Sequence, residues 1–228
     1  MNNLAIITAR GGSKRIPRKN IKEFRGKPII AYSIETALRS GLFSCVMVST
    51  DDAEIASIAK LYGAEVPFLR SANNSNDVAS TADVIKEVLD ELKKAGKEYS
   101  NACCIYPTAP FISEQALTQA YDLLCEKNFD TVFPVCRFSY PIQRALQIEN
   151  DKTTMVWQEN LNVRSQDLAP RYHDAGQFYW INTNAFLSEL KLFTANTGSI
   201  ILDELQVQDI DNETDWKIAE LKHAILYP

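Results

Sequence analysis

The residues with the clearest chemical potential lie in one glycine-rich, cation-rich segment near the N-terminus. Between Arg10 and Lys27 the chain carries eight of its 24 basic residues and a single acidic one, Glu23. Glycines let backbone N–H groups approach phosphate oxygens closely, and several cations can neutralise a polyphosphate. The GxxxxGK[ST] and GxGxxG spacings are absent, so the segment predicts neither a P-loop nor a dinucleotide site. A solvated charged loop is the alternative.

A second candidate is the sequence Asp209-Ile210-Asp211 near the C-terminus. In an extended chain alternate side chains share a face, which would place the two carboxylates about 7 Å apart. Carboxylates so placed could flank Mg²⁺, with water and substrate phosphates completing its coordination shell. The alternative is that one of them is an acidic cap near the last helix.

Other polar residues stand where predicted strands end or predicted helices begin. Tyr106 opens the run Tyr106-Pro107-Thr108-Ala109-Pro110, which could line a site or form a proline-set turn. Arg70 follows the predicted strand residues Pro67-Phe68-Leu69 and could bind a base or a phosphate, or form a surface ion pair.

Three residues, Asp77, Ser80 and Thr81, precede a predicted helix over 82–95. As isolated residues, Ser80 or Thr81 would most simply be the N-cap of that helix. His173, between Tyr172 and Asp174, is the one histidine that the sequence favours as a site residue. No residue is an evident general base, and Lys19 could serve only if its pKa is depressed.

Short apolar runs alternating with helical periods predict the elements that position these residues. Strands are predicted over 4–7, 45–48, 102–106, 131–135, 177–181 and 199–202, and helices over 55–62, 82–95, 117–124 and 216–225. This alternation is typical of α/β proteins with a mostly parallel sheet covered on both faces. In such sheets ligands bind beyond the carboxyl ends of the strands. The basic segment directly follows the first strand, so we expect it to lie at that edge.

The regular alternation stops after Val135. Residues 137–173 mix aromatic, proline and polar residues without a helical period, which indicates a binding loop, a subdomain or an oligomer arm. No linker or internal repeat interrupts the rest, so we expect residues 1–228 to form a single domain with this segment inserted.

Composition excludes several classes of protein. The chain has 228 residues, 46% hydrophobic and 23% charged, with a net charge of -5, which is ordinary for a soluble globular protein. Five cysteines without a CxxC spacing favour reduced thiols and a cytoplasmic location over a disulfide scaffold or structural zinc. The acidic total disfavours nucleic acid as a partner, and no apolar run approaches the ~20 residues of a membrane helix. The N-terminal residues do not read as a signal peptide.

The segment Leu4–Ile21 resembles the N-terminal signature of the cytidylyltransferases that activate nine-carbon sialic-type sugars with CTP. The similarity continues through Val48–Asp52, Tyr106–Pro110 and Asp209–Asp211, in the order expected for the family. Within it, Arg171–Trp180 is most similar to the members that act on pseudaminic acid, since members that act on N-acetylneuraminate usually show an Asn-Gly-Ala-like stretch there. The resemblance implies a Rossmann-like nucleotide-diphospho-sugar transferase fold.

The resemblance also implies roles for individual residues. It assigns catalysis to Lys19, Arg10, Asp209 and Asp211, of which Asp209 and Asp211 would hold Mg²⁺. It assigns nucleotide binding to Ala9, Arg10, Gly11, Gly12, Ser13, Lys14, Lys19, Asn20, Arg70, Ser80 and Thr81. It assigns binding of the sugar to Tyr106, Gln143, Arg144, Arg171, His173, Asp174 and Gln177. Related enzymes have a glutamine where this chain has Tyr106.

The reaction implied is transfer of CMP from CTP to the anomeric hydroxyl of a nine-carbon 2-keto sugar acid, with release of pyrophosphate. The partners expected are CTP, the sugar acid and a second copy of the chain, with no nucleic acid and no membrane. Residues 137–173 would be the dimerisation arm that completes the neighbouring site. Two alternatives stay open: legionaminic or N-acetylneuraminic acid as the sugar, and a regulator that binds nucleotide sugars without reacting.

Overall fold

The apolar runs form one central sheet in a computed structural model that describes residues 2–76 and 78–228. Its strands lie in the order β11-β6-β10-β5-β1-β4, and β9 pairs with the last residues of β6. The bounds are β1 (Asn3–Thr8), β4 (Cys45–Ser49), β5 (Asn101–Ile105), β6 (Thr131–Arg137), β9 (Tyr172–Asp174), β10 (Phe178–Asn182) and β11 (Thr197–Leu202). Only β9 and β10 run antiparallel to their neighbours in this sheet, so the prediction of a mostly parallel sheet is confirmed for the described residues.

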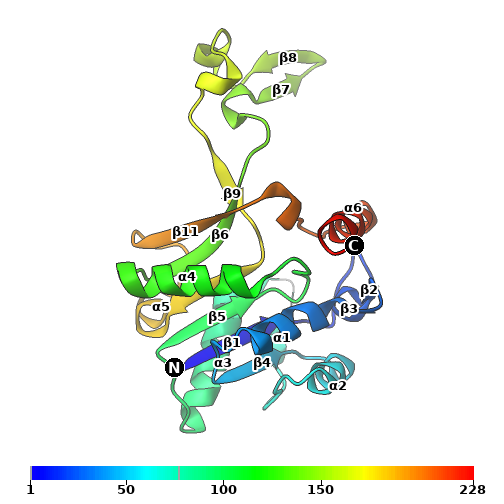
Figure 1. Cartoon of the computed structure of the whole chain (residues 1–228), viewed down its shortest axis with the longest axis vertical. Coiled ribbons are helices and arrows are strands. Elements are labelled where there is room, and N and C mark those ends of the chain that lie inside the picture. The colour runs from blue at the N-terminus through cyan, green and yellow to red at the C-terminus, as the bar shows by residue number, and fades with distance from the viewer. Residues whose placement is uncertain (1, 77) are drawn as a thin grey trace.

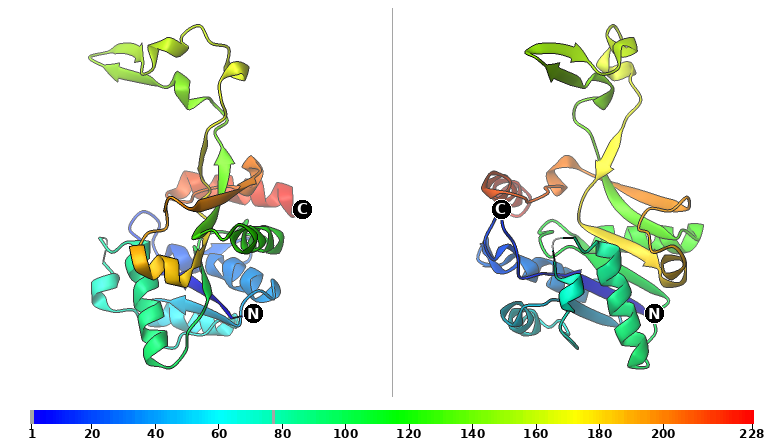
Figure 2. Two further views of the ribbon diagram at one scale, coloured as in Figure 1. Left: turned by 90° about the vertical axis from the view of Figure 1, so that its left-hand side faces the viewer. Right: turned by 180° about the vertical axis from the view of Figure 1, so that it is seen from behind.

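Helices cover both faces of the sheet, as Figures 1 and 2 show. Along β1, Ala5 and Ile7 pack with α1 (Ile29–Arg39), α2 (Ala53–Leu61) and α4 (Glu114–Lys127). The alternate residues Leu4 and Ile6 face the other way, toward α3 (Thr81–Lys94) and α5 (Thr183–Glu189). Because successive strand residues point to opposite faces, a strand that is apolar at every position is buried between two helical layers.

Helices α2 and α3 each begin at a side-chain N-cap, close to the residues at which the sequence predicts a helix to begin. Asp52 accepts hydrogen bonds from the backbone N–H groups of Glu54 and Ile55 at the start of α2. Ser80 forms a reciprocal capping box with Asp83 at the start of α3, so the prediction of an N-cap at this position is confirmed. Asp77, singled out beside Ser80, lies outside the described residues.

Two elements differ from the sequence prediction near the site. Helix α1 was not predicted; it follows Pro28 and buries Ile30, Ile34 and Ala37 on one side. The predicted strand before Arg70 is wrong, because only Glu65 forms a bridge, with Met47. Proline has no N–H to continue the ladder, so the chain leaves the sheet at Pro67.

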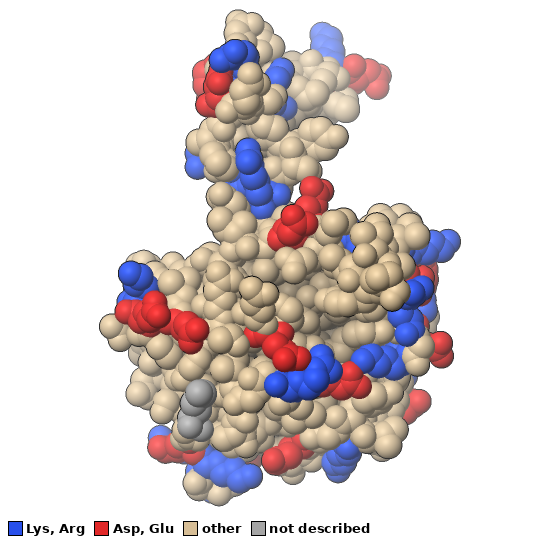
Figure 3. Space-filling model, in the orientation of Figure 1, with Lys and Arg blue, Asp and Glu red and all other residues tan. Residues whose placement is uncertain are grey.

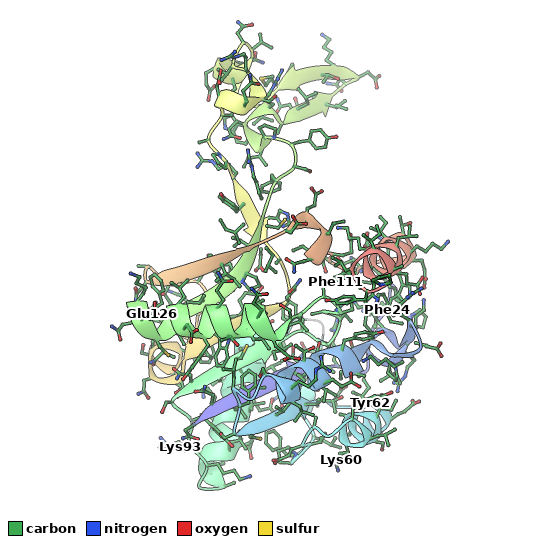
Figure 4. All side chains as sticks on the ribbon, in the orientation of Figure 1. Phe24, Lys60, Tyr62, Lys93, Phe111 and Glu126 are labelled. Atoms are coloured by element: carbon green, nitrogen blue, oxygen red, sulfur yellow. The ribbon has the colours of Figure 1, made fainter. Side chains whose placement is uncertain are left out.

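A third apolar cluster joins the C-terminal helix α6 (Glu213–Leu226) to the N-terminal basic segment. Ile16 and Phe24 pack with Ile210 and Trp216, and Phe24 lies on β2 (Glu23–Phe24), which pairs with β3 (Lys27–Pro28). Figure 4 shows Phe24 and Phe111 beside α6. The cluster therefore brings the basic segment and Asp209–Asp211 to the same end of the sheet.

Residues between β6 and β9 form an arm that projects away from the body in every view (Figures 1 and 2). The neck is the antiparallel pair of β6 and β9, extended by a hydrogen bond of 3.0 Å from Phe138 N to Arg171 O. Its far part contains the hairpin of β7 (Leu146–Glu149) and β8 (Lys152–Met155), a regular element in a segment that the sequence marks as irregular. Two-residue reversals such as Asn150-Asp151 carry weak sequence signals when the flanking strands are this short.

Six short 3₁₀ turns complete the described chain: η1 (Lys19–Ile21), η2 (Ala72–Asn74), η3 (Ile142–Arg144), η4 (Gln158–Asn160), η5 (Ser165–Asp167) and η6 (Glu204–Gln206). Three of them, η3 to η5, lie in the arm.

Among the described residues, none of the helices has the length and apolar content that crossing a membrane requires.

Candidate functional site

A cavity of about 460 Å³ opens beyond the carboxyl ends of β1 and β5. It is lined by Thr8, Arg10, Ser13, Lys14, Arg15, Lys19, Asn20, Tyr106, Pro107, Thr108, Asp209 and Asp211. The fold thus brings the glycine-rich basic segment, the run that begins at Tyr106 and the two C-terminal aspartates into one site. Because the basic segment follows the first strand, the sequence predicts a ligand at this edge of the sheet, and the cavity lies there.

Carboxylates behind the basic segment hold its backbone in place. Gly11 N donates to Asp51 Oδ1 at 2.9 Å, and Arg18 donates to Asp52 Oδ2 at 2.5 Å. A Cβ atom at Gly11 would lie 2.8 Å from Asp52 Oδ2, so the close approach requires glycine. On the other side, Asn20 Nδ2 donates to Arg10 O at 2.8 Å. Asp51 and Asp52 therefore shape the segment from outside the cavity.

Most of the remaining basic side chains in this segment are engaged in ion pairs. Lys22 lies 2.8 Å from Glu213 and 4.5 Å from the centre of the Trp216 ring, and Lys27 pairs with Glu35. On the face drawn in Figure 3, Lys and Arg side chains stand beside Asp and Glu side chains over both body and arm. The basic run of the sequence is thus divided between the cavity and neutralised surface pairs.

Lys19 links the basic segment to the aspartates. Its Nζ donates to Ile210 O at 2.5 Å and lies 3.9 Å from Asp211 Oδ1, and its side chain is only 20% exposed. Burial lowers the pKa of Lys19, while Asp211 and Asp209 act in the opposite direction. Arg15 also reaches Asp211, with Nη2 2.7 Å from Oδ1. A compact group of two carboxylates and two cations therefore forms one wall of the cavity.

The two aspartates fit a divalent cation in their chemistry. Burial, followed by the negative charge of Asp211, raises the pKa of Asp209. A bound cation would relieve that repulsion, and carboxylate oxygens are ligands that Mg²⁺ favours. Within residues 2–76 and 78–228, no group of three or more His, Cys, Asp and Glu side chains is arranged so that it could hold a metal ion. Water and ligand phosphates would have to supply the rest of the shell.

A second cavity of about 220 Å³ adjoins the first, because Thr8 and Arg10 line both. Its other lining residues are Arg70, Asn74, Asn76, Ala79, Ser80, Thr81 and Val84. Arg70 is 7% exposed, and Ser49 fixes its guanidinium by accepting from Nε at 3.0 Å through Oγ and from Nη2 at 2.5 Å through its carbonyl oxygen. A long ligand could extend from the cations of the first cavity to Arg70 in the second.

Three predicted nucleotide-binding residues, Ala9, Gly11 and Gly12, lie in the basic segment but do not line either cavity. Ala9 is fully buried and donates its N–H to Ser49 O at 3.0 Å. The space around a Cβ at Gly12 is open, so the structure places no steric demand for glycine there. Their roles as ligand contacts stay predictions.

The residues predicted for the sugar divide into two groups. Tyr106 lines the first cavity, and Gln177 lies behind it, where Tyr106 N donates to Gln177 O at 2.8 Å. Gln177 is 2% exposed and its Nε2 donates to Gln206 O at 2.5 Å, whereas its Oε1 is buried without a partner among the described residues. It is an acceptor that a nearby donor could use.

The second group lies in the arm and neck, outside both cavities. In the arm, Gln143 Nε2 donates to Ala169 O at 2.7 Å and Arg144 Nη1 donates to Ser165 Oγ at 3.2 Å. In the neck, Arg171 ends the loop before β9, and His173 and Asp174 lie on that strand. The His173 ring packs edge-on against Phe138 with centroids 4.9 Å apart. The structure of one chain does not bring these five residues to the body cavities.

The structure places Pro107 and Thr108, from the run that the sequence suggested could line a site, in the first cavity. It also adds lining residues that the sequence argument did not single out: Thr8 and Arg15 in the first cavity, and Asn74, Asn76, Ala79 and Val84 in the second. Arg15 belongs to the basic run, and Thr8 ends the first strand, so both carried a usable signal. The run Ser71–Asn76 is polar and precedes a helix, which by itself is typical of any surface loop.

Comparisons with known proteins agree with this geometry. A family model described as cytidylyltransferase matches residues 4–224. The chain is 43% identical over 226 residues to pseudaminic acid cytidylyltransferase of Campylobacter jejuni subsp. jejuni serotype O:2, covering 99% of this chain and 97% of that protein. It is 30% identical over 226 residues to CMP-N,N'-diacetyllegionaminic acid synthase of Legionella pneumophila subsp. pneumophila, covering 96% of this chain and 95% of that protein.

Among solved structures, CMP:2-keto-3-deoxy-manno-octonic acid synthetase complexed with CTP has a TM-score of 0.73 at 16% identity. The match covers 99% of this chain and 100% of that one. At this identity the likeness concerns the fold, and it confirms the predicted nucleotidyltransferase fold class.

Proposed function

Because this chain belongs to the cytidylyltransferase family, we propose that it transfers CMP from CTP to the anomeric hydroxyl of pseudaminic acid and releases pyrophosphate. The observation that carries the proposal is the cavity in which Lys14, Lys19, Asp209 and Asp211 converge at the carboxyl end of the sheet. The choice of sugar is supported by Arg171–Trp180 and by a higher identity to the Campylobacter enzyme than to the Legionella one.

In this reaction the anomeric oxygen forms a bond to the α-phosphorus of CTP, and the bond between that phosphorus and the bridging oxygen to the β-phosphate breaks. Such transfers depend on in-line positioning and on neutralising charge on the transferring and leaving oxygens. Arg10, Lys14 and Lys19 line the cavity and would supply positive charge to the phosphates. Asp209 and Asp211 would hold Mg²⁺, which supplies further charge neutralisation when bound.

The second cavity would receive the cytidine. A hydrogen bond to Ser49 holds the Arg70 side chain in this cavity, and Thr81 lines the same cavity at the N-terminal end of α3. A nucleoside placed there would therefore meet fixed polar groups. The cavities meet at Arg10, whose Nη1 donates to Asn76 O at 3.3 Å. Arg10 is thus placed where the base-binding and phosphate-binding parts of a nucleotide would join.

For the sugar we propose that a second copy of the chain contributes its arm. Gln143, Arg144 and Arg171 lie outside the cavities of their own chain, and the arm exposes large apolar side chains. Tyr140 is 85% exposed and Ile148 is 73% exposed. Burial of such side chains against another protein is favourable by roughly 25 cal/mol per Å² of apolar surface. The active form in this proposal is a homodimer with two shared sites.

We also place the reaction in the cytoplasm, where CTP is available. The support is that all five cysteines, each within the described residues, are free thiols and four of them are buried. Reduced thiols are typical of that compartment.

The test is to offer CTP and Mg²⁺ with pseudaminic, legionaminic or N-acetylneuraminic acid in separate reactions. Pyrophosphate release and the mass of the CMP-sugar would both be recorded. We expect product with pseudaminic acid at a kcat/KM at least about tenfold above the other sugars. Product with another sugar alone would overturn the substrate, and no product with any sugar would overturn the transfer reaction.

A further inference from the structure

The segment Gln206–Asp211, which carries both candidate metal ligands, is anchored to the rest of the chain at each end. Val207 and Ile210 are buried, and they pack in two different apolar clusters. Asp209 and Asp211 line the first cavity. The buried residues fix the general course of the segment, and hydrogen bonds to its backbone decide where each carboxylate lies.

Lys222 of α6 holds the start of this segment. Its Nζ donates to Val207 O at 2.7 Å and to Glu204 O at 3.0 Å. Glu204 begins η6, so one ammonium group fixes both this 3₁₀ turn and the residue that follows it. Lysine side chains commonly donate to the carbonyl groups at the end of a helical turn. The C-terminal helix is thereby joined to the backbone two residues before Asp209.

Gln177 holds the same stretch from the side of the sheet. It directly precedes β10, is 2% exposed, and its Nε2 donates to Gln206 O at 2.5 Å. Its own backbone carbonyl accepts from Tyr106 N at 2.8 Å, which continues the pairing of β10 with β5. The neighbouring carbonyl groups of Gln206 and Val207 are therefore held from two sides, one by the sheet and the other by α6.

The far end of the segment is held by a separate set of contacts. Ile210 O accepts from Lys19 Nζ at 2.5 Å. Asp211 N donates to Asp215 Oδ2 at 3.0 Å, within the first turn of α6. These contacts place Asp211 without any contribution from Gln177 or η6.

Asp209 is therefore the carboxylate that depends most on the anchors at the start of the segment. Gln208 and Asp209 are the two residues between Val207 and Ile210, and two residues span at most about 7 Å. A shift at Val207 O would pass to Asp209 with little chain in which to absorb it. A site for a metal ion needs its ligands held closely, because small displacements weaken coordination.

We propose that Lys222 and Gln177 are positioning residues that hold Asp209 where it binds the divalent cation. The inference rests on the proposed function and deepens it, because it names groups outside both cavities that set the affinity for the metal. Partners behind a metal ligand commonly tune metal binding in this way. For Gln177 the proposal replaces the sugar contact implied by the resemblance, since its amide donor is already used within the chain.

The experiment measures Mn²⁺ binding by electron paramagnetic resonance, together with the Mg²⁺ dependence of the rate with CTP and pseudaminic acid. Lys222→Met keeps most of the side-chain stem and removes the donor. We expect its Kd for Mn²⁺ and its Mg²⁺ concentration for half-maximal rate to rise about 3- to 10-fold, with the rate at saturating Mg²⁺ within about twofold of the unaltered value.

Two further variants of α6 serve as controls. Lys222→Arg keeps a charged donor and should lie closer to the unaltered protein than Lys222→Met in both measurements. Lys217→Met removes an exposed cation from the same helix and should change neither.

The direction of the change separates positioning from a simple charge effect. Loss of a cation alone would strengthen the binding of a divalent cation, because repulsion decreases. Loss of an anchor for Asp209 weakens it. Tighter or unchanged Mn²⁺ binding in folded Lys222→Met would therefore overturn the inference, whatever happens to the rate.

Gln177→Met tests the second anchor. Its Kd for Mn²⁺ should also rise about 3- to 10-fold, while KM for the sugar stays within about twofold. A raised KM for the sugar with unchanged Mn²⁺ binding would overturn the positioning role of Gln177 in favour of a sugar contact. If Lys222→Met does not fold, as judged by thermal unfolding, Gln177→Met decides by the Mn²⁺ criterion.

The same titration distinguishes this inference from the proposed metal site itself. Equal Mn²⁺ binding by the unaltered protein and by Asp211→Asn would overturn the metal site of the proposed function. Weaker binding by Asp211→Asn but unchanged binding by both Lys222→Met and Gln177→Met would leave that site in place and overturn the positioning role alone.

Discussion

The basic segment of the body and the arm use their polar side chains differently. In the body, side chains far apart in sequence converge: Lys19 donates to Ile210 O, Gly11 donates to Asp51, and Arg18 pairs with Asp52. In the arm, polar side chains contact other residues of the arm, such as Gln143 with Ala169 O at 2.7 Å and Arg164 with Asp167 at 2.8 Å. The body can therefore preorganise a site by itself, whereas the arm contributes no residue to the two cavities of its own chain.

This difference agrees with a division of labour in the proposed reaction. The body provides the charged groups that phosphates need, and rigid placement of such groups is what transition-state stabilisation requires. The arm exposes the candidate sugar contact Arg144 and apolar side chains such as Tyr140 and Ile148. We therefore expect substitutions in the body to affect turnover and substitutions in the arm to affect sugar binding.

The largest effect is expected at Lys19. Lys19→Ala removes a partly buried cation that contacts Ile210 O and faces Asp211, and kcat should fall at least about 100-fold. The midpoint of thermal unfolding should change by only a few degrees. Steady-state assays and differential scanning calorimetry measure the two quantities.

Lys22→Ala is the matched control, because Lys22 belongs to the same basic run but pairs with Glu213 outside the cavity. Its kcat should stay within about threefold of the unaltered value. Lys19→Arg, which keeps the positive charge, should retain more activity than Lys19→Ala. Equal loss in both Lys19 variants would contradict a role in charge neutralisation and favour a proton-transfer role.

The next effect concerns Asp211. Asp211→Asn removes one of the two negative charges proposed to hold Mg²⁺, so the concentration of Mg²⁺ needed for half-maximal rate should rise about 10- to 100-fold. The rate would be titrated with Mg²⁺, and Mn²⁺ binding by electron paramagnetic resonance would provide an independent readout. An unchanged metal dependence in both measurements would refute this assignment.

A smaller and more selective effect is expected in the arm. Arg144→Ala should raise KM for the sugar about 10- to 50-fold, because it removes the cation that we propose pairs with the carboxylate of the sugar acid. The Kd for CTP, measured by calorimetry, should stay within about twofold. Arg164→Ala in the same arm, where Arg164 pairs with Asp167, is the control and should leave both constants unchanged. Weaker CTP binding in Arg144→Ala would contradict the proposal that the body binds CTP and the arm contacts only the sugar.

The smallest effect is expected on stability, where the ion pair of Arg18 and Asp52 in the body is compared with that of Arg164 and Asp167 in the arm. The hydrogen bond from Arg18 holds the pKa of Asp52 at about 2. Because this pKa lies below the unfolded value of about 4, the stabilisation is fully present above pH 4 and is lost as pH falls toward 2. Asp52→Asn should lower the free energy of unfolding by on the order of 1–2 kcal/mol at pH 7, and by much less near pH 2.

Asp167→Asn tests the arm in the same way. Arg164 and Asp167 are 72% and 46% exposed in their side chains, so removing this pair should change the free energy of unfolding by less than about 0.5 kcal/mol. Urea unfolding at pH 7 and at low pH measures both variants. Equal destabilisation by the two substitutions would mean that the ion pair of Asp52 stabilises the body no more than the ion pair of Asp167 stabilises the arm.

The sequence was sufficient for the parts of the site that depend on local pattern. Apolar runs predicted the strands, and the glycines and cations after the first strand predicted a cavity at the correct edge of the sheet. The convergence of Lys19 with Ile210 depends on the packing of Ile16, Phe24 and Trp216, which no local pattern encodes. The resemblance assigned Lys19, Asp209 and Asp211 to one catalytic site, which residue types alone would not have done.

The sequence argument was weakest where local signals were short or ambiguous. Helix α1 follows a proline and the basic run, and its apolar positions lack the clear caps that marked α2 and α3. The hairpin of β7 and β8 has only four residues in each strand. The hydrogen bond from the Tyr179 hydroxyl to Asp174 joins β10 to β9, two strands that only the folded sheet brings together.

The most direct test of this division is complementation between two defective chains. Lys19→Ala would be combined with Arg144→Ala in one heterodimer, isolated through two different affinity tags. Each variant alone should form an inactive or strongly impaired homodimer. The heterodimer should regain about half of the unaltered rate, because one of its two sites pairs an intact body with the intact arm of its neighbour. A heterodimer as inactive as its parents, or a fully active Arg144→Ala homodimer, would contradict the account.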